Sequence, residues 1–518
     1  MQLSLKDSDP LADAKRQLLQ STRSLLESTS AEDLESLLAS ARVLCLRERD
    51  LYFLDSPDDL KSSLNPQNEA AALSLLLQAA LQSKGPDADL LHAIVERCNA
   101  FGQPSPASTT GVMDASSTEL QRWAAEQKVS GSLAPATWGS LRGAAAAVDV
   151  AAGGVVMSVP ASLLISEELV AGSDLGQALA AIPGLQPETA ALIWTMVERA
   201  DPESQFAPFW RSLPAAFNTG LGVSSDLLKV FEGTPAELQF TAARQHIQDQ
   251  YAQLQPVLDM LTQAYPEQLG APGLFTWAAY QWAVELWYAY ALQVEFPGGR
   301  VLPCLVPLAS LLNHSPWPHV VRYGSLCAAT NTLDLCAFRA CGVGQQCFLS
   351  YGPLPNLQLL LFYGFTVRAN PHDTVSITFD EPDDDLAEER TELLERQQLT
   401  LDHSLRPAPA PLPSRLLATL RILLCEQDDL ERLASCSQAG SAQATISEAG
   451  EAAVLETLAE VLQALGAAYV AALQRLEPST QAQAGFTAFA HIFLEGQHAI
   501  LRAALAEVVA RQQSLKGH

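Results

Sequence analysis

Short β-type segments occur in two separate blocks of this chain, and this limits the folds that it can adopt. The first block, 139–166, has brief β-favouring runs punctuated by glycines and a proline, which predicts a hairpin despite four consecutive alanines. The second block, 301–379, contains the runs RVLPCLVPL, DLCAFRA, QCFLSY and VSITF. Residues from about 167 to 294 instead have apolar residues at helical spacing. A helical insertion therefore divides the β segments along the chain.

The rest of the chain has a helical pattern on both sides of these blocks. Amphipathic runs such as AAALSLLLQAALQ precede the Pro- and Ser-rich segment FGQPSPASTTG. Helical runs also follow the second block, interrupted by the stiff segment LRPAPAPLP. We expect an α+β fold with these parts: a helical N-terminal extension at 1–100, a linker at 101–115, a β-containing domain at 116–380 with its insertion at about 167–294, and a helical domain at 381–518.

The charge of the chain limits its partners. The formal net charge is −27 at pH 7, so we expect neither nucleic acid nor an anionic membrane as a ligand. The sequence has no run of eighteen uncharged apolar residues, so it predicts no membrane span. The N-terminus lacks the apolar segment of a signal peptide. We expect a soluble intracellular protein, cytoplasmic or nuclear, with the plastid stroma left open.

The cysteines do not predict a metal site. Of nine cysteines, Cys327, Cys336, Cys341 and Cys347 come closest to a cluster. Their spacings of 9, 5 and 6 lack the close pairs of a zinc site, so we expect reduced core thiols and no metal.

Two apolar runs end in polar side chains, and these are the candidate chemistry. LVPLASLLNHS, read as a buried strand, ends in Asn313 and His314, and QCFLSY ends in Tyr351 before a glycine. The chain has no phosphate loop, GxSxG elbow or HExxH helix. The set suits transfer of a group from a bound donor, where the protein mostly positions two reactants. Alternatively, the first two side chains cap a turn and Tyr351 is a core aromatic with a wet edge.

Several motifs in order resemble one family. LVPLASLLNHS is similar to the VP-x-x-D-x-x-NHS strand of SET-domain protein methyltransferases, specifically the Rubisco large-subunit lysine methyltransferase class, to which the actin-histidine methyltransferase also belongs. YGPLPNLQLLLFYGF, RGAAAAVDVAAGGVVMSVP and FAPFWRSLP resemble further segments of that class. ISEAGEAAVLETL and EGQHAIL resemble its C-terminal substrate-binding domain. The resemblance covers about 116 to 510.

The resemblance implies a SET β-fold with a pseudoknot and a helical insertion, followed by an all-helical domain that grips a protein substrate. It also implies S-adenosylmethionine as the methyl donor and no metal. Tyr351 matches the catalytic tyrosine of the class.

The same resemblance implies a set of cofactor-binding residues. Asn313 and the backbone near His314 would hold the amino acid end of the donor. Backbone groups around Arg142 and Gly143 would line the same cavity, and Phe365 would pack on the adenine.

Some positions depart from the family pattern. The family Asp is Ser310, the helix Arg aligns with Tyr290, and the basic residue after the tyrosine is Leu354. Gly154 and Leu141 replace a Glu and a Gly of the opening motif. A non-catalytic protein-interaction module built on the same fold is therefore the alternative to an enzyme.

Two substrate-pocket positions bear on the target residue. The actin-histidine enzyme has a Trp and an Asn where this chain has Ala309 and Leu292. Groups that could hold an imidazole are therefore absent, and we expect lysine rather than histidine as the target. Outside these motifs, we expect His319, His372 and His498 to be exposed, and Asp383–Asp385 to form a solvated loop at a helix entry.

Overall fold

The computed structural model describes residues 1–21, 25–83, 88–102, 111–114, 117–321, 324, 326–435, 446–476 and 484–516. Most of the linker predicted at 101–115 lies outside these residues. The chain forms two compact units, each built from segments that are not contiguous. The first comprises Met1–Cys45, Asn65–Phe217 and Ala242–Pro353, and the second Leu46–Leu64, Asn218–Thr241 and Leu354–His518. The domain boundaries predicted from the sequence stay predictions.

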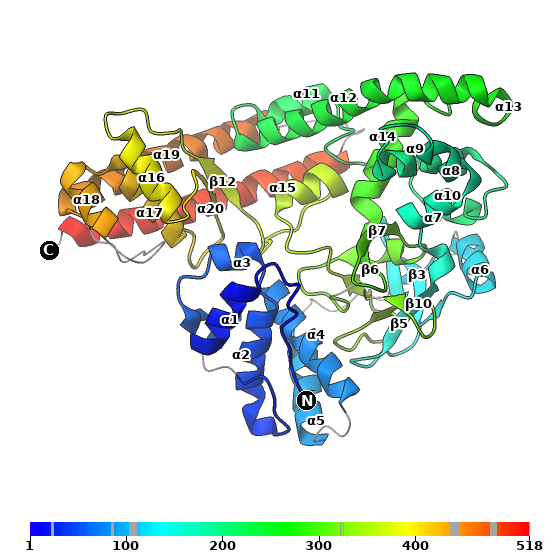
Figure 1. The fold of residues 1–518 in the computed structure, drawn as a ribbon, viewed down its shortest axis with the longest axis horizontal. Helices are drawn as coiled ribbons and strands as arrows, with labels where there is room; N and C mark the ends of the chain where they lie inside the picture. Colours follow the sequence, from blue (N-terminus) through cyan, green and yellow to red (C-terminus); the bar gives the residue numbers. More distant parts are fainter. Residues whose placement is uncertain are drawn as a thin grey trace. The chain divides into compact units, whose positions relative to one another are not determined.

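The first unit carries most of the β structure and two groups of helices (Figure 1). Its helices are α1 (Ala12–Ser21), α2 (Leu34–Leu44), α4 (Pro66–Gln82), α5 (Ala88–Ala100), α6 (Thr118–Glu126), α7 (Glu167–Gly172), α8 (Asp174–Ala180), α9 (Pro187–Ala200), α10 (Ala207–Ser212), α13 (Pro266–Leu269), α14 (Trp277–Tyr290) and most of α12 (Pro235–Ala264). Its strands are β1 (Val112–Met113), β2 (Ser130–Gly131), β3 (Leu133–Trp138), β4 (Leu141–Ala146), β5 (Val155–Pro160), β6 (Ala291–Glu295), β7 (Val301–Leu305), β8 (Asn313–His314), β9 (Leu326–Cys327), β10 (Thr332–Cys336) and β11 (Phe348–Leu349).

The strands form several small sheets rather than one. One has the order β1-β3-β4 and another the order β2-β5-β10-β9, and β6 pairs with β7. The hairpin predicted at 139–166 is therefore wrong in its pairing, although both of its strands form. β4 pairs with β3 across a tight turn at Gly139, whose φ of +63° suits glycine, and β5 pairs with β10, which is distant in sequence. Strand propensity identified the strands but did not specify their partners.

The run LVPLASLLNHS is not one strand, contrary to the prediction. β7 ends at Leu305, and Pro307 follows, which has no N–H to donate to a sheet. Leu308 has a positive φ of +64°, and a single 3₁₀ turn, Ala309–Leu311, then separates β7 from β8. The bend allows β8 to leave the β6–β7 pair and find a different partner.

The N-terminal helices pack on the β part of the first unit. Leu73 and Leu77 of α4 belong to one hydrophobic core with Val321 and Phe338, which follow the strands of the second block. Between α2 and α4, Arg42 donates two hydrogen bonds to the buried carboxylate of Glu69, at 2.7 and 3.0 Å. The extension is therefore part of this unit's core.

The second unit is mainly helical. Its elements are α3 (Glu48–Tyr52), α11 (Ser225–Leu228), α15 (Asn356–Gln358), one π-helical turn (Leu359–Tyr363), α16 (Ala387–Arg396), α17 (Ser414–Leu424), α18 (Gln427–Ser435), α19 (Glu448–Arg475), α20 (Ala484–Lys516) and the strand pair β12 (Val375–Thr378) and β13 (Asp402–Leu405). The two longest helices that lie wholly in this unit, α19 and α20, pack along each other (Figure 1). α19 is long and apolar enough to cross a membrane by length and composition, which is weak evidence because core helices pass the same test.

A buried polar cluster joins the segment before β12 to α15 and α20 in the second unit. Asp373 accepts hydrogen bonds from the backbone and side-chain N–H groups of Asn356 and from Gln497 of α20. The neighbouring His372 is only 4% exposed, so its predicted exposure is wrong. Its backbone carbonyl accepts a 2.5 Å hydrogen bond from Arg49. A lone histidine in a polar loop sequence gave no sign of this burial.

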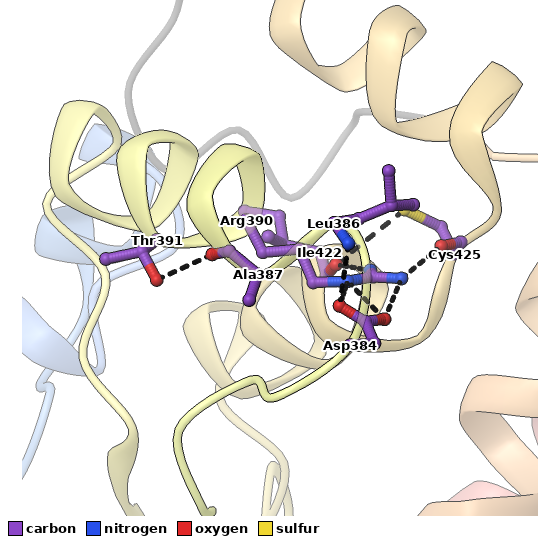
Figure 2. Close-up of polar contacts among 7 residues, drawn as sticks. All are labelled: Asp384, Leu386, Ala387, Arg390, Thr391, Ile422 and Cys425. Atoms are coloured by element: carbon purple, nitrogen blue, oxygen red, sulfur yellow. Dashed lines mark hydrogen bonds and ion pairs between the residues drawn. The ribbon is translucent and has the colours of Figure 1, made fainter.

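Arg390 of α16 joins three segments of the second unit (Figure 2). Its guanidinium pairs with Asp384 at 3.0 Å and donates to the carbonyl oxygens of Ile422 and Cys425. The side chain is 5% exposed, whereas that of Asp384 is 49% exposed. Asp384, predicted to lie in a solvated loop, thus takes part in a structural ion pair.

We expect Arg390→Lys to lower the unfolding free energy by about 2–4 kcal/mol. The single ammonium group of lysine cannot reproduce the planar, multiply donating guanidinium group of arginine, so at least one of the carbonyl oxygens of Ile422 and Cys425 loses its hydrogen-bond donor. Urea unfolding of this variant and of Arg396→Lys, an exposed arginine on the same helix, measures the difference. Equal losses in the two variants would contradict the structural role of Arg390.

Candidate functional site

Two segments far apart in sequence meet in the parallel pair β8–β11. Asn313 lies opposite Phe348, and His314 lies opposite Leu349. The pairing continues on both sides, since the N–H of Ser315 donates to the carbonyl of Leu349 at 3.1 Å. These two strands therefore bring together the polar ends of the two apolar runs.

Tyr351 follows β11 and is held at three points by the other segment. Its hydroxyl donates to the carbonyl of Leu312 at 2.7 Å, and its backbone N–H donates to Nδ1 of His314 at 3.1 Å. The rings of Tyr351 and His314 lie 5.2 Å apart between centroids. The phenol proton is committed to a carbonyl, so the oxygen's lone pairs remain as acceptors.

His314 is positioned as a neutral ring. It is 8% exposed, and burial lowers its pKa to about 4. Because Nδ1 accepts from the backbone of Tyr351, the ring proton is on Nε2. The side chain fixes the path of the chain at Tyr351.

Asn313, Gly143 and Gln346 converge beside the same pair of strands. The Asn313 amide donates to the carbonyl of Arg142 at 2.9 Å and so ties β8 to β4. A Cβ at Gly143 would lie 2.5 Å from Nε2 of Gln346 and 2.7 Å from Nδ2 of Asn313. Only glycine at position 143 allows the side chains of Gln346 and Asn313 to lie this close to the backbone of β4. Among the described residues, Nε2 of Gln346 is buried without a hydrogen-bond acceptor, which is costly unless a ligand supplies one.

The side chain of Arg142 forms hydrogen bonds and an ion pair within the first unit. It donates to the carbonyl of Ser212 and to the hydroxyl of Ser117, both at 2.7 Å, and its Nε lies 3.1 Å from Asp114. The predicted contribution of the Arg142 backbone to the cofactor site stays a prediction.

The predicted substrate-pocket residues are buried and apolar. Leu292 lies on β6 and is 6% exposed, and Ala309 begins the turn before β8 and is 1% exposed. Tyr290 ends α14 and packs on Phe217, with ring centroids 5.7 Å apart. Burial raises the pKa of Tyr290, and the positive charge of Arg142 partly opposes that rise.

Phe365 belongs to the second unit, where it follows the π-helical turn. Its ring lies edge-on to that of Tyr363, with centroids 6.3 Å apart. Its predicted stacking on an adenine stays a prediction.

Sequence reasoning missed two residues near the strand pair. Gln346 is one of a pair of glutamines before a cysteine, with no motif around it. Gln67 of α4 accepts a 2.6 Å hydrogen bond from the hydroxyl of Ser350, which precedes Tyr351. Only the three-dimensional contact reveals either role, since both are common surface residue types.

A cavity of about 630 Å³ opens elsewhere in the first unit. It lies beside α8, α9 and α13, and its lining includes Leu175, Val197 and Leu269. None of the predicted site residues lines it.

Comparison with known proteins identifies a domain in the second unit. Residues 381–501 match the family model described as Rubisco LSMT substrate-binding. Actin-histidine N-methyltransferases are similar to this chain: that of Xenopus tropicalis is 27% identical over 279 residues, 53% of this chain and 47% of the relative. That of Homo sapiens is 27% identical over 289 residues, 55% of this chain and 48% of the relative. The chain thus spans about half the length of the curated relatives it matches.

Solved structures show the fold. The SET domain of LSMT bound to lysine and AdoHcy matches with a TM-score of 0.64 at 18% identity, covering 78% of this chain and 93% of that one. Rubisco LSMT bound to AdoMet matches with a TM-score of 0.60 over the same shares, also at 18% identity. The predicted α+β SET fold with a helical C-terminal region is confirmed, as is the resemblance from which it was drawn.

We expect acid to destabilise the protein in part through His314. Because its folded pKa is about 4 and its unfolded pKa about 6.5, its contribution is fully present above about pH 6.5 and is lost as pH falls toward 4. The full loss is about 3 kcal/mol, from 1.36 kcal/mol per pKa unit. His314→Asn keeps an acceptor for Tyr351 and removes the titration, so its urea-unfolding stability should fall less between about pH 7 and pH 4.

His403, whose pKa burial also lowers to about 4, is present in both proteins and cancels in the comparison. Parallel stability curves for the two proteins would show that His314 does not titrate as its burial requires.

Proposed function

We propose, from the premise that this chain has the SET fold of Rubisco LSMT and a matching substrate-binding domain, that it transfers a methyl group from S-adenosylmethionine to a side-chain nitrogen of another protein. The observation that carries the proposal is the parallel pair β8–β11, which sets Asn313 beside the segment that leads to Tyr351. The domain at 381–501 supports a protein as the substrate. The absence of nucleic acid, membrane and metal among its ligands stays a prediction, as does the intracellular location.

The residues around Gly143 fit such a cofactor. Glycine at position 143 of β4 lets the side chains of Gln346 and Asn313 pack against this strand, and the buried Nε2 of Gln346 is a donor that a bound cofactor could supply with an acceptor. A carboxylate or an adenine nitrogen is a suitable acceptor. Asn313, whose Nδ2 is bound to the carbonyl of Arg142, presents Oδ1 as an acceptor suited to an ammonium group. When bound, the cofactor supplies an electrophilic methyl group on a sulfonium.

Tyr351 aligns the attacking nitrogen in this proposal. Its hydroxyl proton points to the carbonyl of Leu312, so its oxygen and nearby carbonyl oxygens can accept from the nitrogen and make weak C–H···O contacts with the methyl group. Holding both reactants in line lowers the entropic part of the barrier. No proton needs to leave Tyr351 itself.

Lysine is the target that the pocket favours. Free lysine has a pKa of about 10.4, so only a small neutral fraction can attack at pH 7. Buried apolar side chains such as Leu292 and Ala309 penalise the ammonium and raise that fraction. Neither side chain offers a hydrogen bond to an imidazole.

Histidine is the second candidate, because the similar curated proteins are actin-histidine N-methyltransferases. Tritiated-methyl labelling of a lysate that lacks this protein, followed by mass spectrometry of the labelled band, identifies the modified residue. Methyl-lysine supports the pocket argument, and methyl-histidine overturns it while leaving methyl transfer intact.

We expect Gln346→Ala to weaken S-adenosylmethionine binding about tenfold, since about 1.4 kcal/mol is a typical loss for one hydrogen bond to a charged acceptor. Calorimetry measures the affinity. Gln345→Ala, at an exposed neighbouring position, is the control and should bind normally. No binding by the unaltered protein would favour the non-catalytic interaction module.

We expect Tyr351→Phe to bind the cofactor with nearly unchanged affinity and to lose methyl transfer at least about 100-fold. The phenyl ring keeps the packing on His314 but has no oxygen to align the nitrogen. Undiminished transfer in a single-turnover assay would remove Tyr351 from its assigned role.

A further inference from the structure

A second polar cluster lies behind the strand pair, in the first unit. His319, Cys341 and Cys347 are all buried, and their ligand-type atoms lie within 4.8 Å of one another. Cys347 immediately precedes β11, and the backbone N–H of His319 donates to the carbonyl of Phe348 at 2.8 Å. The sequence predicted an exposed His319, which is wrong because it is 5% exposed.

The histidine ring is oriented as a hydrogen-bond donor to sulfur. Nδ1 of His319 accepts from the backbone N–H of Phe348 at 3.1 Å, so the neutral ring carries its proton on Nε2. A side-chain hydrogen bond joins His319 to Cys341. A metal on Nε2 would require the proton on Nδ1, where it would face the N–H of Phe348. The geometry therefore favours a stabilised thiolate over a bound metal ion.

The surroundings favour an anion on Cys341. Hydrogen bonds from Cys347 and His319 outweigh burial and lower the pKa of Cys341 to about 5, whereas the same pairing raises the pKa of Cys347. Arg339 adds a fixed positive charge nearby, because its guanidinium donates to the carbonyl oxygens of Pro318 and Trp317 at 2.8 and 2.9 Å. Redox-active cysteines combine a low pKa with a neighbouring thiol and with access to solvent; Cys341 has the first two features, whereas both cysteines are fully buried.

The two sulfurs lie directly beneath a short surface loop. Cys341 and Cys347 flank Gly342–Gln346, in which Val343 is 60% exposed. One end of the loop is fixed by paired backbone hydrogen bonds between Cys341 and Val150, both at 2.9 Å, and the other by the N–H of Cys347, which donates to the carbonyl of Ala144 at 2.9 Å. Both cysteines are fully buried, so an oxidant has to reach them through an opening of the structure, and a disulfide has to bring sulfurs that lie within 4.8 Å to a separation of about 2.0 Å.

We propose that Cys341 and Cys347 are a redox-active dithiol that a peroxide oxidises to a disulfide. The Cys341 thiolate attacks one peroxide oxygen; the S–O bond forms, the O–O bond breaks, and hydroxide leaves. The Cys347 thiol gives up its proton and attacks the sulfenic sulfur; the S–S bond forms and a second hydroxide leaves. Two sulfurs are oxidised by two electrons in all and two peroxide oxygens are reduced; the proton that Cys341 lost when its thiolate formed and the proton that Cys347 gives up convert the two hydroxides to water. The proposal does not depend on methyl transfer.

The test treats the intact protein with stoichiometric hydrogen peroxide, alkylates the remaining thiols in denaturant and maps them by peptide mass spectrometry. We expect a disulfide between Cys341 and Cys347, while Cys98 and Cys304 stay alkylated. These two controls are equally buried, and burial raises the pKa of each to about 12. Oxidation that falls on the less buried Cys327 alone would overturn the proposal.

Single variants separate the two steps. Cys347→Ser should accumulate a sulfenic acid at Cys341 that a dimedone-type probe traps, and Cys341→Ser should give neither product. His319→Phe should slow the reaction about tenfold by removing the Nε2 donor. Stoichiometric zinc in the purified protein by elemental analysis, lost in Cys341→Ser, would show a metal site instead.

Discussion

The parallel pair β8–β11 is the constraint on which the candidate site depends. Each strand has only two residues, so the backbone bonds between them cannot fix the crossing alone. Side chains complete it: Tyr351 bonds to the carbonyl of Leu312 and to His314, and Asn313 bonds to the carbonyl of Arg142. The crossing is therefore stabilised by the same polar groups to which the proposed function assigns the binding and alignment of the reactants.

The N-terminal helix α4 contacts the segment that leads from β11 to Tyr351. Gln67 accepts a hydrogen bond from the hydroxyl of Ser350, and the Ser350 oxygen in turn accepts a hydrogen bond from the N–H of Gly352 at 3.1 Å. Both side chains are buried, at 4% and 2% exposure, so the contact is screened from water. The segment that carries Tyr351 is thus braced by α4. Removal of the extension would expose a polar contact one residue from the proposed catalytic phenol.

Sequence reasoning succeeded where local pattern decides structure. The helical regions that contain α4 and α14 were predicted from apolar spacing, and the structure adds the capping side chains Asn65 and Thr276. It failed where tertiary contacts decide. The partner of β5 and the burial of His319 depend on distant segments, and no local signal encodes them. Asn313 and Tyr351 were singled out as the polar ends of two apolar runs and were given roles by the family resemblance, whereas Gln346 lies outside any motif and is visible only as a buried amide without an acceptor.

The departures from the family pattern bear on whether the site is intact. Ser310 and Tyr290 replace an acid and a base, so the two changes together leave the net charge of the region as it was. Tyr290 is packed on Phe217, and burial raises its pKa, so this position is filled by a neutral, shielded side chain. The two changes are therefore compatible with a packed site of the kind that the proposed function assigns to Asn313 and Tyr351.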